Sequence, residues 1–140
     1  MTDRYFVQTP ITGGGVTLAG PEAHHLIHVM RAKPGDRVAL FDGTGAEFAA
    51  RIDRIGRNEA EMTVLSRELV DRELPWELTL AVCLPKPDRQ RWLVEKAVEL
   101  GLTRLVPLVT SRSAGQVRPN SLLRLRRTVV EASKQCGRNR

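Results

Sequence analysis

Residues 1–73 show the short, alternating hydrophobic pattern of β-strands. Within residues 47–55, Phe48, Ala50 and Ile52 alternate with polar residues, a period of two that predicts a half-buried strand. Glycine-rich turns separate this segment from its neighbours, as expected for β-hairpins. Several short strands at this spacing predict a small barrel or sandwich. The expected strands are residues 4–7, 16–18, 37–41, 47–55 and 60–65.

A single short helix is predicted among these strands. Pro21 fits the first helical position and Glu22 the first turn, where an acidic side chain is favourable. The helix is expected to run to about Arg31 and to end before Pro34-Gly35. Its predicted core-facing stripe consists of Leu26, Ile27, Val29 and Met30.

The pattern changes after an acidic, polar segment at residues 66–76, which predicts a linker and a domain boundary near residue 73. Residues 78–84 form a continuous apolar run, typical of a buried parallel strand. Asp88 is expected to cap a helix that runs to about Leu100 and ends at Gly101. Its predicted core face carries Leu93, Ala97 and Leu100.

A second strand and helix follow. The strand is expected at residues 105–109, and the helix between a cap at Asn120 and a stop at Gly137. The order β-α-β-α predicts the first part of an α/β domain with a parallel sheet. Two such strands are normally joined by neighbours, so we expect the domain to be incomplete here. The predicted buried stripe of the helix is Leu122, Leu125, Val129, Ala132 and Cys136.

Charge is distributed unevenly along the chain. Residues 1–73 carry nine Lys and Arg against 11 Asp and Glu, whereas residues 74–140 carry 13 against five. The second half therefore suits a polyanionic partner, the alternative being a basic solvated surface. No apolar run spans a membrane and no signal peptide is visible, so a cytoplasmic location is expected. Cys83 and Cys136 are expected to be free, buried thiols.

Nucleotide and metal motifs are missing at the places where they would be expected. The segment Pro85–Arg89 follows the first strand of the second half without a glycine-rich loop. His24 and His28 have helical spacing, but an HExxH zinc motif would require Glu where His25 stands. We therefore expect no metal, and interpret the histidines as packed side chains or as nucleic-acid contacts beside Arg31.

Several charged residues are candidates for chemistry. Arg112 follows the second apolar strand, at the carboxyl end where α/β folds bind ligands. In Gly137–Arg140, glycine permits a close turn and two arginines supply forked donors for phosphate or base edges. Lys96 and Glu99 form either a surface pair or part of a charged cleft. Either a solvated face or phosphate contact explains the run Arg124, Arg126 and Arg127.

Four stretches together resemble a known family. They are Arg4-Tyr5-Phe6; His24–Arg31 with Pro34–Asp36 and Leu40–Gly43; Glu95–Gly101 followed by Pro107; and Glu131–Arg140. In order and spacing they resemble the RsmE family, the methyltransferases that form N3-methyluridine in small-subunit (16S) ribosomal RNA.

The resemblance implies a two-part architecture. Residues 1–73 would form a small PUA-like β-barrel for RNA recognition, and residues 77–140 the N-terminal, incomplete part of a SPOUT domain of the trefoil-knot type. The intact enzyme would be a homodimer that uses S-adenosylmethionine. The family's donor-binding motifs match nothing in this sequence and are expected beyond Arg140. The resemblance thus implies a C-terminally truncated chain that binds no cofactor or metal and is inactive alone.

The resemblance also implies a role for each candidate residue. The partner would be 16S rRNA, and the chemistry requires loss of the uridine N3 proton and stabilisation of the resulting anion. Arg112, Arg138 and Arg140 are the candidates for that electrostatic role, while Lys96 and Glu99 would order the site. The expected RNA-binding residues are Arg4, His25, His28, Arg31, Arg112, Arg138 and Arg140.

Two other functions are compatible with the residues alone. One is a PUA-like RNA-binding or ribosome-assembly module without catalysis. The other is an unrelated small α/β enzyme. Aromatic residues make up only 4% of the chain, which argues against a single-strand reader of the RRM type.

Overall fold

The chain consists of two compact units. The computed structural model describes residues 3–113 and 119–140. The first unit comprises Met1–Asp71 together with Asn139–Arg140, and the second comprises Arg72–Arg138. The last two residues therefore group with the first unit, although they follow the second along the chain.

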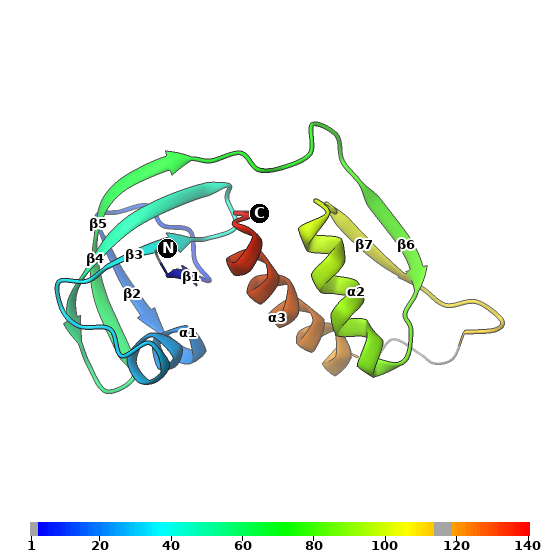
Figure 1. The fold of residues 1–140 in the computed structure, drawn as a ribbon, viewed down its shortest axis with the longest axis horizontal. Helices are drawn as coiled ribbons and strands as arrows, with labels where there is room; N and C mark the ends of the chain where they lie inside the picture. The colour runs from blue at the N-terminus through cyan, green and yellow to red at the C-terminus, as the bar shows by residue number, and fades with distance from the viewer. Residues whose placement is uncertain (1–2, 114–118) are drawn as a thin grey trace. The chain divides into compact units, whose positions relative to one another are not determined.

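A curled five-stranded sheet forms the first unit, with the strand order β1-β3-β4-β5-β2 (Figure 1). β1 and β3 are parallel, and the other neighbouring pairs are antiparallel. In the described residues the end strands β1 and β2 do not pair, so the expected barrel is an open, curled sheet. The strands are β1 (Arg4–Phe6), β2 (Gly15–Ala19), β3 (Arg37–Phe41), β4 (Ala46–Ile55) and β5 (Glu59–Leu69).

The predicted helix of the first unit is shorter than expected and changes type. It begins as α1 (Gly20–His24) and continues as a π-helical turn, η1 (His25–Val29). The backbone N–H of Met30 donates to the carbonyl of His25 at 3.0 Å, the five-residue spacing of a π-turn. Arg31 then adopts a φ of +54°, which ends the helical conformation. The predicted stripe is therefore partly wrong, because Val29 and Met30 are exposed.

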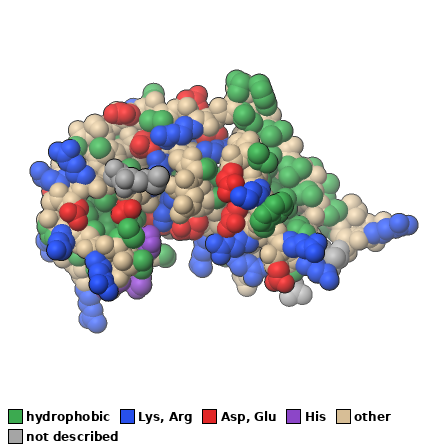
Figure 2. All heavy atoms as spheres, in the orientation of Figure 1, with side chains coloured by type: hydrophobic (Ala, Val, Ile, Leu, Met, Phe, Trp, Pro, Cys, Tyr) green, Lys and Arg blue, Asp and Glu red, His purple; other side chains and the backbone are tan. Residues whose placement is uncertain are grey.

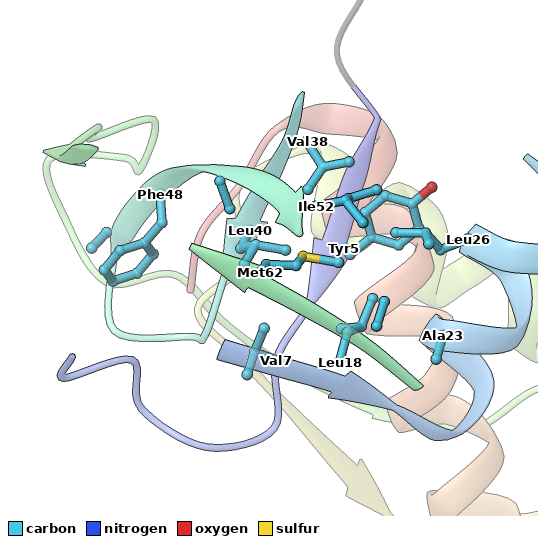
Figure 3. Packing of buried hydrophobic residues seen from close by; sticks show 13 residues of the cluster. Tyr5, Val7, Leu18, Ala23, Leu26, Val38, Leu40, Phe48, Ile52 and Met62 are labelled. Atoms are coloured by element: carbon cyan, nitrogen blue, oxygen red, sulfur yellow. The ribbon is translucent and has the colours of Figure 1, made fainter. Parts of the chain in front are cut away.

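The core of the first unit lies between the sheet and this helical segment (Figure 3). Phe48, Ala50 and Ile52 are all buried on the inner face of β4, which confirms the alternation expected from the sequence. Burying a large apolar side chain contributes roughly 1.5–3 kcal/mol, so this cluster is the main source of the unit's stability. The largest fully buried side chains are Tyr5, Leu18, Leu26, Leu40 and Ile52.

The second unit has the predicted β-α-β-α order. β6 (Thr79–Cys83) and β7 (Arg104–Leu108) pair in parallel. The helices α2 (Pro87–Glu99) and α3 (Pro119–Cys136) lie side by side (Figure 1). Both helices begin one residue before the expected caps, because proline occupies an early helical position where its missing N–H costs nothing.

The residues at which the two helices end match the prediction better than the residues predicted to be buried. Gly101 and Gly137 follow α2 and α3 with φ values of +86° and +80°, as predicted for glycine stops. The buried core is Val94, Val98, Leu125 and Ala132. The predicted faces are partly wrong: Leu100 follows the last helical residue and is 72% exposed, and Leu122 and Val129 are each 38% exposed. Cys83 and Cys136 are free but only partly buried.

The described residues lack both a helix suited to cross a membrane and a side-chain cluster suited to bind a metal. No helix among them has the length and apolar character needed to cross a membrane. Within the same residues, no group of three or more His, Cys, Asp or Glu side chains is arranged to hold a metal ion.

Replacing Ile52 by alanine tests the core of the first unit. Ile52 is fully buried, so Ile52→Ala should lower the free energy of unfolding by about 2–5 kcal/mol through lost burial and a residual cavity. The matched control is Leu69→Ala at the end of β5, where the side chain is 74% exposed and the change should stay within about 0.5 kcal/mol. Urea unfolding measures both; equal effects would contradict the assigned core.

Tyr5 provides an optical test of the same core, because it is the only tyrosine in the chain. Burial, and then the nearby charges of Asp3 and Glu22, raise the pKa of Tyr5 to about 12. The fold therefore favours the neutral phenol, and this contribution to stability is lost as pH rises from the unfolded pKa of about 10 toward 12. Tyrosinate absorbance should appear near pH 12 in the folded protein and near pH 10 in urea. Titration near pH 10 in both would contradict the burial.

Candidate nucleic-acid interface

Arg138 is the most completely bonded of the candidate residues. Its side chain is 7% exposed and forms an ion pair with Glu73 through Nη2. Nε donates to both carboxylate oxygens of Glu73 at 3.1 Å. Nη1 donates to the backbone carbonyls of Val98 at 2.9 Å and Leu102 at 3.0 Å. All three guanidinium nitrogens of Arg138 therefore bond to the second unit itself.

This bonding ties three segments of the second unit together. A buried ion requires a well-oriented partner and further hydrogen bonds to offset its lost hydration, and Arg138 has both. In return, Arg72 donates from Nη1 to the carbonyl of Gly137 at 2.6 Å. A β-carbon added to Gly101 would lie 2.8 Å from Cγ of Leu74, so the segment after Glu73 also packs closely on the unit. The geometry thus supports a positioning role for Arg138, and its direct contact with RNA stays a prediction.

Arg112 lies in the turn that follows β7, at the carboxyl edge of the two-stranded sheet. The backbone N–H of Thr110 donates to Oγ of Ser113 at 2.6 Å, and the N–H of Ser113 donates back to the Thr110 carbonyl at 3.0 Å. These bonds fix the turn and leave Arg112 exposed. Hydrogen bonds from Ser113, and then Thr110, lower the pKa of the Cys83 thiol beside it. The edge is therefore polar, with an accessible guanidinium.

Lys96 and Glu99 form a local pair on α2. Lys96 Nζ lies 2.6 Å from a carboxylate oxygen of Glu99, and both side chains are more than 40% exposed. Arg91 and Glu95 make a similar exposed pair at 2.6 Å. Such surface pairs contribute about 0–1 kcal/mol. Of the two interpretations, this geometry matches the surface pair, and a role in ordering the site is still only predicted.

In the first unit, Arg4 forms the centre of a polar cluster. Its guanidinium pairs with Glu47 and lies 5.0 Å from the centre of the Phe41 ring. Nη2 also donates to Oδ1 of Asn139 at 2.6 Å. Asn139 is 2% exposed, and its backbone carbonyl accepts the N–H of Gly45 at 3.1 Å. Arg4 thus holds Asn139 in place.

Arg140 is exposed next to this cluster. Gly45 has a φ of +94°, which favours glycine, and a β-carbon added there would lie 2.8 Å from Nε of Arg140, so a side chain at this position would displace the guanidinium. The preceding turn is fixed by Asp42, whose carboxylate accepts the N–H groups of Ile11 and Thr44 at 2.8 and 3.0 Å. Burial alone would raise the pKa of Asp42, but these bonds and the Thr44 hydroxyl lower it. The cluster brings the predicted residues Arg4 and Arg140 together.

The histidines lie on the helical segment. The rings of His24 and His28 are 4.7 Å apart, and both residues are exposed, as is Arg31 after them. His25 faces the core, with its ring 6.1 Å from that of Tyr5. In the described part of the chain its buried Nδ1 has no hydrogen-bond partner. His28 and Arg31 are thus available to a ligand, whereas His25 is mainly packed.

Three important residues did not stand out in the sequence. Glu73 and Glu47 are the carboxylate partners of Arg138 and Arg4, and Asn139 joins Arg4 to the Gly45 backbone. Glu73 and Arg138 are 65 positions apart, so no local pattern links them. Glu73 is one of several acidic residues in the segment at residues 66–76, so nothing in the sequence marks it as the partner of Arg138.

Removing Glu73 tests the buried pair. Glu73→Ala would leave the Arg138 guanidinium buried without its counter-ion, which should cost about 3–5 kcal/mol in the stability of the second unit. Glu95→Ala is the control, because it breaks the exposed pair with Arg91 and should cost less than about 1 kcal/mol. Amide hydrogen exchange in α2 and α3 measures the difference. Similar small losses for both variants would show that the pair adds little.

Comparison with known proteins links both units to one family. A family model described as an RNA methyltransferase domain matches residues 72–140, and one described as an RNA methyltransferase PUA domain matches residues 18–65. Two curated relatives are named ribosomal RNA small subunit methyltransferase E. The one from Synechocystis is 33% identical over 88% of this chain and 40% of its own length. The one from Rickettsia conorii is 36% identical over 82% of this chain and 46% of its own length.

A solved structure shows the same likeness in three dimensions. It is a ribosomal RNA small subunit methyltransferase E from Neisseria gonorrhoeae bound to S-adenosylmethionine. It is 30% identical, with a TM-score of 0.89 over 99% of this chain and 58% of its own. The chain thus spans about half the length of these relatives. The matches cover both units in the same order, and the chain therefore belongs to the RsmE family of ribosomal RNA small subunit methyltransferases.

Proposed function

We propose that the intact protein methylates N3 of a uridine in small-subunit 16S rRNA, with S-adenosylmethionine as the methyl donor. The observation that carries this proposal is the likeness, over nearly the whole chain, to the Neisseria gonorrhoeae enzyme that binds S-adenosylmethionine. In this proposal residues 1–73 are a PUA-like RNA-recognition domain and residues 77–140 the first part of a SPOUT domain. The intact protein would act as a homodimer in the cytoplasm.

The methyl donor is proposed to bind outside these 140 residues. The second unit has a hollow of about 470 Å³ at the start of α3, lined by Pro119, Asn120, Ser121 and Arg124. S-adenosylmethionine carries a positive sulfonium, which an arginine at the wall of the hollow repels. Among the described residues, the lining of the hollow contains no acidic or aromatic side chain to hold the donor. The residues present there do not fit the donor, so no step of the chemistry is assigned to this hollow.

The role proposed for this chain is to hold RNA. Arg31, His28 and Arg140 are exposed on the first unit, and Arg112 is exposed on the second. Phosphate oxygens and base edges are the groups that such donors contact, and phosphate contacts set the register of a nucleic acid. Arg4, His25 and Arg138 act indirectly, because their side chains are packed or bonded within the protein.

The uridine chemistry requires charge stabilisation more than a strong base. The N3 proton is weakly acidic, and its loss leaves an anion that nearby guanidinium groups stabilise. Arg112 and Arg140 have accessible guanidinium groups for this purpose. Arg138 fixes the end of α3, and the Lys96–Glu99 pair orders the surface of α2. A uridine within folded RNA would also have to leave its stack to reach these groups.

A chimeric enzyme tests the proposal directly. The 140-residue chain is joined to the remaining C-terminal part of the Neisseria gonorrhoeae relative and incubated with unmethylated 16S rRNA and S-adenosylmethionine. We expect N3-methyluridine in the digested RNA, detected by mass spectrometry. Arg112→Gln should lower the rate at least tenfold, since each lost electrostatic contact in a transition state costs a few kcal/mol.

The control is Arg91→Gln in the same chimera, which removes an exposed arginine that is paired with Glu95 and should leave the rate unchanged. A chimera that binds S-adenosylmethionine and 16S rRNA without methylating uridine N3 would contradict the enzyme assignment. That result would favour an RNA-binding or assembly module. An Arg112→Gln rate equal to that of the parent would remove Arg112 from the chemistry.

A further inference from the structure

The first half of α3 carries an arginine surface that the proposed site does not use. Arg124, Arg126 and Arg127 are all exposed, and we call them the α3 arginine surface. Basic side chains gather along the lower edge of the second unit in Figure 2, where α2 and α3 begin in Figure 1. We propose that this surface is a second RNA contact, which binds the phosphate backbone of the rRNA without reading its sequence.

The α3 arginine surface lacks acidic partners among the described residues. Within the described residues, no ion pair or side-chain hydrogen bond engages any of these three guanidinium groups. Some other exposed basic residues are neutralised: Arg51 by Asp53, Arg54 by Glu61, and Arg91 by Glu95. The three arginines of α3 are instead open to an external anion, as Arg31, Arg112 and Arg140 are, but they gather within four residues of one helix.

The placement of the three arginines disfavours the α-helical conformation of α3. Arg124 and Arg127 are three positions apart on one side of α3, and like charges at this spacing repel. The first turn of α3 contains no acidic residue, although acidic side chains there would complement the helix dipole. Glu131 is the sole acidic residue of the 18-residue helix, and it lies near Lys134. Helix stability therefore does not explain the three arginines, whereas binding a polyanion does.

The shape of the adjoining surface supports the same proposal. The hollow of about 470 Å³ at the start of α3 includes Arg124 in its lining, together with the amide of Asn120 and the hydroxyl of Ser121. These are donors of the kind that contact phosphate oxygens. The Arg124 guanidinium in the lining of the hollow repels the positive sulfonium of the methyl donor and attracts a negatively charged phosphate group. Residues 74–140, with 13 basic against five acidic side chains, give the whole region the matching sign.

The inference rests on the proposed function, because its partner is the RNA of that function. RNA backbone is the occupant that charge complementarity favours. The exposed side chains of Leu122 and Leu123 directly precede Arg124, so a second copy of the chain is the competing occupant, which RNA binding and self-association of the same variants distinguish.

The test compares RNA binding by two triple variants of the 140-residue chain. The first carries Arg124→Gln, Arg126→Gln and Arg127→Gln; the control carries Arg51→Gln, Arg54→Gln and Arg91→Gln and loses the same charge from paired sites. The affinity for 16S rRNA is measured at several salt concentrations. We expect the α3 variant to reduce the salt slope by about three, roughly one for each arginine, and the control by less than about one. A triple arginine-to-lysine variant at the α3 positions should retain the slope.

Each other outcome overturns a defined part of the account. An α3 variant with the slope of the control would refute the arginine surface while the proposed function stands. Unchanged RNA binding with reduced self-association, measured by sedimentation, would assign the surface to a second copy. If the unaltered chain does not bind 16S rRNA, the proposed function fails together with this inference. The α3 variant should unfold at an equal or higher temperature, and a lower one would refute the argument from helix stability.

Discussion

The buried bond between Arg138 and Glu73 is the constraint on which the second unit depends. It joins Arg138, the second residue after α3, to the segment before β6, and the same guanidinium donates to the carbonyls of Val98 in the last turn of α2 and of Leu102 just beyond that helix. The Val98 carbonyl also accepts the N–H of Gly101 at 3.0 Å, so Arg138 adds a second donor to the last turn of α2 and a donor to the Leu102 carbonyl beyond the helix stop. A unit with only two strands and a small apolar core, Val94, Val98, Leu125 and Ala132, needs such a polar tie.

The next residue along the chain repeats this principle in the first unit. Asn139 is buried, accepts a hydrogen bond from Arg4 and accepts the N–H of Gly45, while Arg140 remains exposed. In each unit, therefore, a candidate RNA-binding arginine also holds other segments in place, Arg138 in one and Arg4 in the other, while RNA contact by either stays a prediction. The accessible residues Arg112, Arg140, His28 and Arg31 lie beside these fixed groups or on turns and helix ends of defined conformation. This division between supporting and accessible residues underlies the proposed function.

Sequence reasoning was accurate where the signal is local. The expected strand at residues 37–41 matches β3, the alternation in β4 is confirmed, and the glycine stops after α2 and α3 have the positive φ expected. It failed where tertiary packing decides, as at Leu100, Leu122 and Val129, which have helical spacing but are exposed. The π-turn at His25–Val29 has no periodic signature. The ion pair Arg4–Glu47 joins residues that are 43 positions apart, and Arg138–Glu73 joins residues that are 65 positions apart. No local sequence pattern predicts pairs at such separations.

The central claim is that this chain holds RNA by itself, independently of the methyl donor. The most direct measurement is the affinity of the 140-residue chain for 16S rRNA with and without saturating S-adenosylmethionine. A coupling between two ligands requires that each change the affinity for the other. The account predicts salt-dependent RNA binding that S-adenosylmethionine leaves unchanged, because the donor is proposed to bind outside these 140 residues. RNA binding that appears only with the donor, or is strengthened severalfold by it, would contradict the account.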